Sequence, residues 1–145
     1  MKCILQRVSQ ASVSVDGRCV ARIDTGLLVL TGIAPQDDQA VARRMLERIL
    51  GYRIFSDEQD RMNRNVGEVG GGVLLVPNFT LMADTRKGMR PSFGAAAEPQ
   101  QARDLFEWMC AQAAEQHPDV GYGVFGADMQ VMLINDGPIT ITLTS

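Results

Sequence analysis

The 145-residue sequence contains only one histidine, His117, and three cysteines. A serine or cysteine hydrolase needs a histidine beside its nucleophile, but His117 stands directly before a proline and adjoins no nucleophile, so we expect it to end a helix. Zinc sites use clustered Cys and His ligands, whereas Cys3, Cys19 and Cys110 are widely spaced. The sequence therefore predicts no zinc site, and no metal or other cofactor is expected.

Long apolar runs are also missing, since none reaches the roughly 18 residues of a membrane-spanning helix. The N-terminal stretch MKCILQRVSQ has no small-residue cleavage site, so it is not expected to be a signal peptide. An odd number of scattered cysteines is untypical of a secreted disulfide scaffold. These features predict a cytoplasmic protein with a single domain over residues 1–145, because domains most often have roughly 100–150 residues.

The charge is close to balanced, with 14 basic and 17 acidic residues and a net charge of −3. The electrostatic field of a negatively charged protein repels nucleic acid. Any RNA contact must therefore be local, and binding to DNA is not expected. Basic residues do cluster, and one cluster consists of Arg86, Lys87 and Arg90. A solvated surface is the competing interpretation of each cluster.

Alternating apolar residues predict short strands at 3–8, 11–15 and 19–23, with Asp16-Gly17 as a hairpin turn between the last two. The apolar run over 26–33 predicts a strand buried on both faces. Further strands are expected at 52–55, 73–76, 129–135 and 139–143. The last two are separated by Asp136-Gly137-Pro138, which by propensity alone is a hairpin turn.

Helical spacing of apolar residues predicts two helices, at about 37–51 and 99–117. Asp37 or Asp38 can cap the first helix, and Pro118 ends the second. The strands are too clustered along the chain for a parallel wound sheet. The expected architecture is therefore α+β, with an antiparallel sheet rolled into a barrel-like core and two main helices.

Without a usable histidine, an enzyme with this sequence would depend on backbone donors and substrate groups. The segment Pro77–Leu81 is one candidate, because a strand there gives way to a loop with a hydroxyl and exposed N–H groups. A β-bulge or a simple strand end is the structural alternative. The second candidate is the segment from Asn135 to Thr140.

Both candidate segments belong to longer stretches with a recognisable pattern, which are LLVPNFTLMADTRKGMRPSF, YRIFSDEQDRMNRNVGEVGGG, MKCILQRVSQASVSV and FGADMQVMLINDGPIT. In these stretches the chain resembles the D-aminoacyl-tRNA deacylases, also called D-tyrosyl-tRNA deacylases. The resemblance is collinear over essentially the whole chain. NDGPIT combined with FTL, GMRPSF and FGADM makes it specific.

The resemblance implies a metal-free homodimer that hydrolyses the ester between a D-amino acid, or glycine, and the terminal adenosine of tRNA. In that family a cis Gly-Pro pair, here Gly137 and Pro138, enters the partner's pocket and excludes L-substituents. The matching backbone donors are Asn78, Phe79 and Thr80, and catalysis uses the ribose 2′-hydroxyl of the substrate. Because they follow that segment closely, Arg86, Lys87 and Arg90 are the expected contacts to the tRNA acceptor end.

One departure concerns the first donor segment, where the family usually has Ser-Gln-Phe-Thr-Leu and this chain has Pro77 and Asn78 in the first two places. A related deacylase branch in animals also carries proline there. A non-catalytic homologue that binds the acceptor end, or only dimerises, is therefore the rival hypothesis. An unrelated histidine-dependent esterase would need His117 in the pocket.

Overall fold

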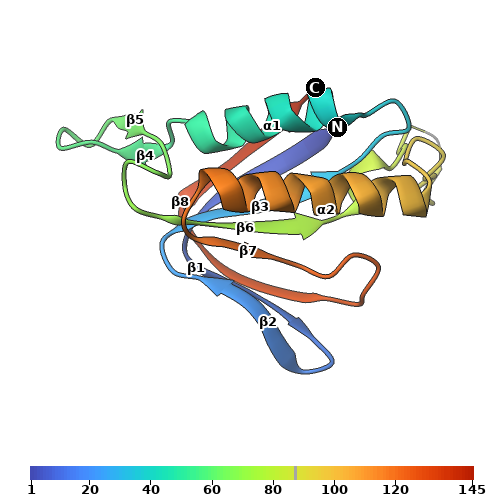
Figure 1. The fold of residues 1–145 in the computed structure, drawn as a ribbon, viewed down its shortest axis with the longest axis horizontal. Helices are drawn as coiled ribbons and strands as arrows, with labels where there is room; N and C mark the ends of the chain where they lie inside the picture. Colours follow the sequence, from blue (N-terminus) through green and yellow to red (C-terminus); the bar gives the residue numbers. More distant parts are fainter. Residues whose placement is uncertain (87) are drawn as a thin grey trace.

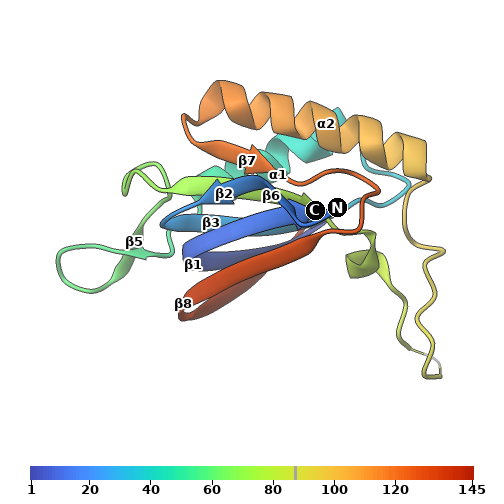
Figure 2. The ribbon, with the colours of Figure 1, turned by 90° about the horizontal axis from the view of Figure 1, so that it is seen from below.

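The computed structural model describes residues 1–86 and 88–145. Lys87, one of the three expected tRNA contacts, lies outside the described residues. Two helices lie side by side across one face of a curved, six-stranded sheet (Figures 1 and 2). The helices are α1 (Gln39–Gly51) and α2 (Pro99–Gln116), and the sheet contains β1 (Lys2–Val15), β2 (Arg18–Ile23), β3 (Gly26–Gly32), β6 (Gly72–Pro77), β7 (Val120–Tyr122) and β8 (Gln130–Thr144).

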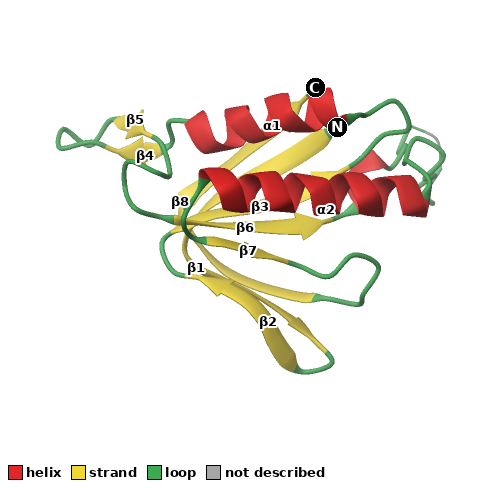
Figure 3. Ribbon diagram, viewed as in Figure 1, coloured by secondary structure: helices red, strands yellow, loops and turns green. Residues whose placement is uncertain are grey.

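The α+β class and the two main helices are confirmed, as is the barrel-like sheet (Figure 3). The sheet curls until β2 approaches β7, so that a Cβ built on Gly121 would lie only 3.1 Å from the Cβ of Ala21. A small hairpin of β4 (Phe55–Ser56) and β5 (Met62–Arg64) stands apart from this sheet. The strand expected at 52–55 is thus reduced to its last residue and one more.

The sheet is mixed, so the expectation of a purely antiparallel sheet is wrong in part. Strand β1 pairs antiparallel with β2, β3 and β8, but β6 pairs parallel with both β3 and β7. The reason is that α1 lies between β3 and β6, and α2 between β6 and β7, and a helical crossover returns the chain in the same direction. Strands β3 and β6 are almost wholly buried, as is usual for parallel strands covered on both faces.

Two expected pairs of strands are each one continuous strand. The strands expected at 3–8 and 11–15 form β1, and those expected at 129–135 and 139–143 form β8. The hairpin turn expected at Asp136-Gly137-Pro138 is therefore wrong. Both halves of β8 pair with β1 in the same antiparallel sense, so the chain leaves the ladder briefly and does not reverse.

Apolar side chains fill the space between the helices and the sheet. Helix α1 contributes Ala42, Met45, Leu46 and Ile49, and α2 contributes Leu105, Phe106 and Met109, among others. A second cluster, which includes Val8, Val13, Leu28 and Leu74, lies inside the curled part of the sheet. The two clusters hold β3 and β6 between them, which fixes the ends of these strands in place.

A buried ion pair stabilises the start of β1. The Met1 ammonium lies 2.6 Å from Asp37 Oδ1, and the Ala34 N–H donates to Asp37 Oδ2 at 2.7 Å. Both members of the pair are almost completely shielded from water. We expect Asp37→Ala to lower the free energy of unfolding by about 3–5 kcal/mol, because it leaves a buried ammonium without its partner. Urea denaturation measures this.

Asp38→Ala is the matched control for this prediction. Asp38 is the exposed N-cap of α1, and its Oδ1 accepts the Val41 N–H at 2.9 Å. Loss of such a cap costs about 0.5–2 kcal/mol. An Asp37→Ala effect no larger than the Asp38→Ala effect would contradict a stabilising role for the buried pair.

Candidate active site

The first candidate segment lies where β6 ends. Pro77 is the last residue of β6, where its missing N–H breaks no further ladder bond, and η1 (Phe79–Met82) follows as a single 3₁₀ turn. The Asn78 N–H donates to the Thr31 carbonyl at 2.7 Å, which ties the start of the turn to the end of β3. The turn is thereby held at the carboxyl end of two buried parallel strands.

Asn78 caps this turn with its own side chain. Its Oδ1 accepts the Thr80 N–H at 3.2 Å and also the Thr80 hydroxyl. The Leu81 N–H donates to the Asn78 carbonyl at 3.3 Å. Among the described residues, no acceptor pairs with the Phe79 N–H, and the Phe79 side chain is 58% exposed. The Phe79 N–H is therefore a main-chain donor of this turn that has no acceptor among the described residues.

Two residues that were not expected from the sequence, Gly32 and Lys2, contact the 3₁₀ turn. A Cβ on Gly32 would lie 2.9 Å from the Leu81 Cβ and 3.1 Å from the Asn78 carbonyl oxygen, so the turn packs directly on a glycine backbone. Lys2 Nζ donates to the Leu81 carbonyl at 3.1 Å. Neither role has a sequence signal, because both depend on residues that are distant along the chain.

The second candidate segment is an exposed excursion from β8. Asn135 pairs with Val8 and Thr140 with Gln6, so the residues between them stand opposite Arg7 alone. The Gly137-Pro138 peptide bond is cis, and Gly137 has φ = 147°. We call the exposed part of this excursion, Asp136 to Pro138, the selector segment, after the role that the family resemblance leads us to expect of it.

Arg7 contacts the selector segment from β1. Its Nε donates to the Asp136 carbonyl at 2.9 Å and lies 3.3 Å from Asp136 Oδ2. Arg7 Nη1 donates to the Ile54 carbonyl at 2.8 Å. Sequence analysis did not identify Arg7, because its partners are more than 40 residues away in the sequence.

Within one chain the two candidate segments are far apart. Pro77 is level with Thr31 and Cys3 in the sheet, whereas the selector segment is level with Arg7, and β1 and β3 lie between β8 and β6. With a rise of about 3.3 Å per residue and about 4.8 Å between strands, the separation is roughly 20 Å. Within a single copy of the chain, the two segments therefore do not adjoin each other.

Arg86 and Arg90, two of the three expected basic contacts, lie between η1 and α2, in a part of the chain that projects away from the sheet in Figure 2. Arg86 forms a two-pronged pair with Asp84, with Nε–Oδ1 and Nη2–Oδ2 distances of 2.9 and 2.6 Å. The Arg86 guanidinium holds the pKa of the Asp84 carboxyl below its usual value. Arg90 is exposed and has no acidic partner among the described residues. Phe93 connects this segment to the turn, since its ring packs edge-on against Phe79 at 5.0 Å.

The single histidine does not belong to either candidate segment. His117 is buried at the end of α2, where its Nε2 lies 2.7 Å from the Gly71 carbonyl. Gly71 precedes β6 and Asn78 follows it, so the ring and the turn lie at opposite ends of that strand. The histidine-dependent esterase hypothesis is thus contradicted.

Two of the cysteines are equally unsuited to nucleophilic attack. Burial raises the pKa of the Cys110 thiol to about 12 and that of the Cys3 thiol to about 11, so both stay protonated at neutral pH. In the described part of the chain, no three His, Cys, Asp or Glu side chains gather as metal ligands would. None of its helices has the length and apolar character needed to cross a membrane.

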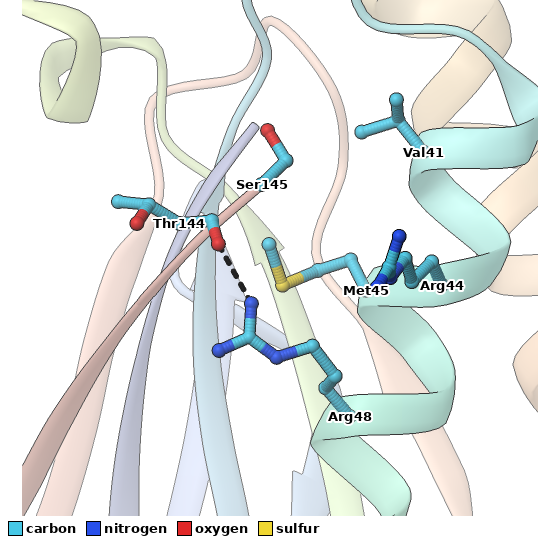
Figure 4. A pocket seen from close by; sticks show the side chains of 6 residues that line it. All are labelled: Val41, Arg44, Met45, Arg48, Thr144 and Ser145. Carbon is cyan, nitrogen blue, oxygen red and sulfur yellow. Dashed lines mark hydrogen bonds between the residues drawn. The ribbon is translucent and has the colours of Figure 1, made fainter.

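A separate pocket lies between α1 and the end of β8 (Figure 4). Its volume is about 420 Å³, and its lining includes Arg44, Met45 and Arg48 of α1. Arg48 donates to the Thr144 carbonyl at 2.6 Å, which ties the helix to the strand. None of the catalytic, selector or tRNA-binding residues expected from the sequence lines this pocket.

Comparison with known protein families finds relatives along nearly the whole chain. The model of the D-Tyr-tRNA(Tyr) deacylase family matches residues 4–144. The chain belongs to this family. A relative named D-aminoacyl-tRNA deacylase from Stutzerimonas stutzeri (strain A1501) is 53% identical over 145 residues, covering all of both chains. One of the same name from Ectopseudomonas mendocina (strain ymp) is 55% identical over 143 residues, covering 99% of each.

Two solved structures have the same fold as this chain. A structure titled c-Myc DNA Unwinding Element Binding Protein superposes with a TM-score of 0.95 at 36% identity, covering 100% of this chain and 99% of that one. A probable eukaryotic D-amino acid tRNA deacylase superposes with a TM-score of 0.84, covering 98% and 97%. At 17% identity, the second structure supports the fold alone.

Proposed function

We propose that this chain hydrolyses the ester bond of D-aminoacyl-tRNA and of mischarged glycyl-tRNA, releasing the amino acid and tRNA. The observation that carries this proposal is the Phe79 N–H, a main-chain donor without an acceptor among the described residues, at the turn after β6. Full-length relatives that bear the deacylase name support it. Such an activity would serve quality control of translation in the cytoplasm.

In the proposed reaction, a water oxygen attacks the ester carbonyl carbon and negative charge develops on the carbonyl oxygen. The Phe79 N–H donates to that oxygen, and the expected donors Asn78 and Thr80 shape the same turn. The bond between the carbonyl carbon and the ribose 3′ oxygen then breaks. The proton lost by the water reaches the 3′ oxygen through the ribose 2′-hydroxyl, so the scheme needs no metal ion and no titrating side chain.

We propose further that the selector segment rejects L-substituents and acts on the site of a second copy. The roughly 20 Å between the two segments in one chain supports this, since a two-fold pair exchanges the same element in both directions. Met132 and Ile134 of β8 are 62% and 52% exposed, which leaves apolar surface for such a contact. Light scattering should therefore report a homodimer at micromolar concentration, and an active monomer would contradict it.

The basic residues Arg86, Lys87 and Arg90 are proposed to contact the tRNA acceptor end. Because Asp84 pairs with Arg86, we expect the larger effect at Arg90. Arg90→Ala should raise KM for the aminoacyl-tRNA. It should also reduce the slope of log binding constant for tRNA against log salt concentration by about 0.7, the value for one single-strand phosphate. Arg18→Ala, on the exposed turn side of β2, is the control. Equal effects of the two variants would leave Arg90 as a merely solvated charge.

Turnover by the purified protein on paired D- and L-aminoacyl-tRNAs tests the proposed function. We expect multiple turnovers on the D-substrate and on glycyl-tRNA, with the L-substrate spared. The rival hypothesis, a homologue that lost activity through the Pro77-Asn78 change, predicts binding of the acceptor end without release of amino acid. If that hypothesis holds, Pro77→Ser combined with Asn78→Gln should bring back the hydrolytic activity.

A further inference from the structure

The selector segment is exposed, and only a few contacts fix its position. Asp136, Gly137 and Pro138 are all exposed, and none of them pairs with a residue of β1 in the ladder. A short exposed segment samples many conformations unless side chains restrain it, because ordering each residue costs about 1–2 kcal/mol of backbone entropy. Stereochemical discrimination needs the opposite, a segment held in one geometry.

Asn135 provides such a restraint at the base of the excursion. Its Oδ1 accepts the Ile139 N–H at 2.6 Å, and its Nδ2 donates to the Ile139 carbonyl at 3.0 Å. Nδ2 also lies 3.2 Å from Thr140 Oγ1. One side-chain amide thus satisfies both main-chain groups of Ile139, the residue that immediately follows the selector segment.

The chemistry of these contacts explains why the residue is asparagine. A side-chain amide carries an acceptor and a donor in the same arrangement as a peptide group, so it can replace the strand neighbour that Ile139 lacks. Aspartate keeps the acceptor but loses the donor, and its charge would face the Ile139 carbonyl. The backbone of Asn135 is itself held in register with Val8 of β1, so the restraint is anchored to the sheet.

We propose that Asn135 is a positioning residue for stereoselectivity, which holds the selector segment so that it can exclude L-substituents. This inference rests on the proposed function for the role of the segment, and on the three Asn135 contacts for the restraint. Asn135 touches no reacting atom. It acts through Gly137 and Pro138, whereas Arg7 contacts the segment at its other end.

Asn135→Asp is the principal test, with Asn135→Ala as the stronger variant. We expect the ratio of kcat/KM for D- over L-aminoacyl-tRNA to fall by about ten-fold in Asn135→Asp, which loses the Nδ2 donor, and by more in Asn135→Ala, which loses all three contacts. Amide hydrogen exchange at Ile139 should speed up in Asn135→Ala. A merely structural role would lower the melting temperature and leave the D/L ratio unchanged.

Gln6→Ala is the matched control, because Gln6 Nε2 also donates to Thr140 Oγ1, at 3.3 Å, but makes no hydrogen bond to Ile139 among the described residues. Its D/L ratio should remain that of the wild type. An unchanged D/L ratio in Asn135→Asp and Asn135→Ala, in a wild type that is D-selective, would overturn the inference. Wild-type protein that hydrolyses neither substrate would instead refute the proposed function, and unchanged Ile139 exchange in Asn135→Ala would then still overturn the restraint.

Discussion

Phe79→Pro should lower kcat for D-aminoacyl-tRNA hydrolysis by about 10²–10³, the usual cost of removing one oxyanion donor. Proline lacks the N–H that the turn presents, yet its ring is compatible with the first position of a helical turn. The preceding residue, Asn78, has φ = −145° and ψ = 90°, which is outside the helical region that a following proline disfavours. The variant therefore removes the proposed donor and leaves the turn able to form.

Phe79→Ala is the control, because it removes the ring and its contact with Phe93 but keeps the N–H. We expect it to change kcat far less than Phe79→Pro does. Thr80→Ala should also be mild, since in this structure the Thr80 hydroxyl donates to Asn78. A Thr80→Ala defect of several orders of magnitude would indicate a hydroxyl nucleophile and contradict the proposed mechanism. Single-turnover assays separate these chemical effects from substrate binding.

Gly137→Ala should reduce D-substrate turnover and admit L-substrates, with the D/L ratio of kcat/KM falling by about ten-fold or more, since about 1.4 kcal/mol of lost discrimination is ten-fold. The φ of 147° at Gly137 is one that residues with a side chain rarely adopt. A Cβ there would also lie 2.7 Å from Ile139 Cγ1 and 2.8 Å from the Ile139 nitrogen. The selector segment must shift to relieve both contacts.

Gly17→Ala separates backbone strain from displacement of the selector segment. Gly17 lies in the turn between β1 and β2 at φ = 73°, and a Cβ there meets nothing within 4 Å. We expect it to lower stability and to keep the wild-type D/L ratio. A Gly137→Ala enzyme with the same ratio as wild type would contradict the role of the segment in discrimination.

The candidate segments illustrate how far local sequence can lead. The end of the apolar run at Pro77, followed by a hydroxyl and free amides, already suggested a backbone-donor site, and the structure has a capped turn there. The folded geometry was needed to see that the Asn78 side chain accepts the Thr80 N–H. It leaves the Phe79 N–H as the donor without an acceptor among the described residues. The same holds for Lys2 and Gly32, which support the turn from strands that precede it by more than 40 residues.

Elements that depend on neighbours along the chain can be predicted from local patterns. Helical spacing and the Asp38 cap predict α1, Pro99 predicts the start of α2, and an unbroken apolar run predicts the buried strand β3. The parallel pairing of β6 and the continuity of β8 depend instead on contacts between distant parts of the chain. The tetrapeptide Asn-Asp-Gly-Pro favours a turn locally. Because β8 is hydrogen-bonded to β1 both before and after it, the strand keeps its direction. Strand pairing depends on partners distant in sequence, and no local pattern carries that information.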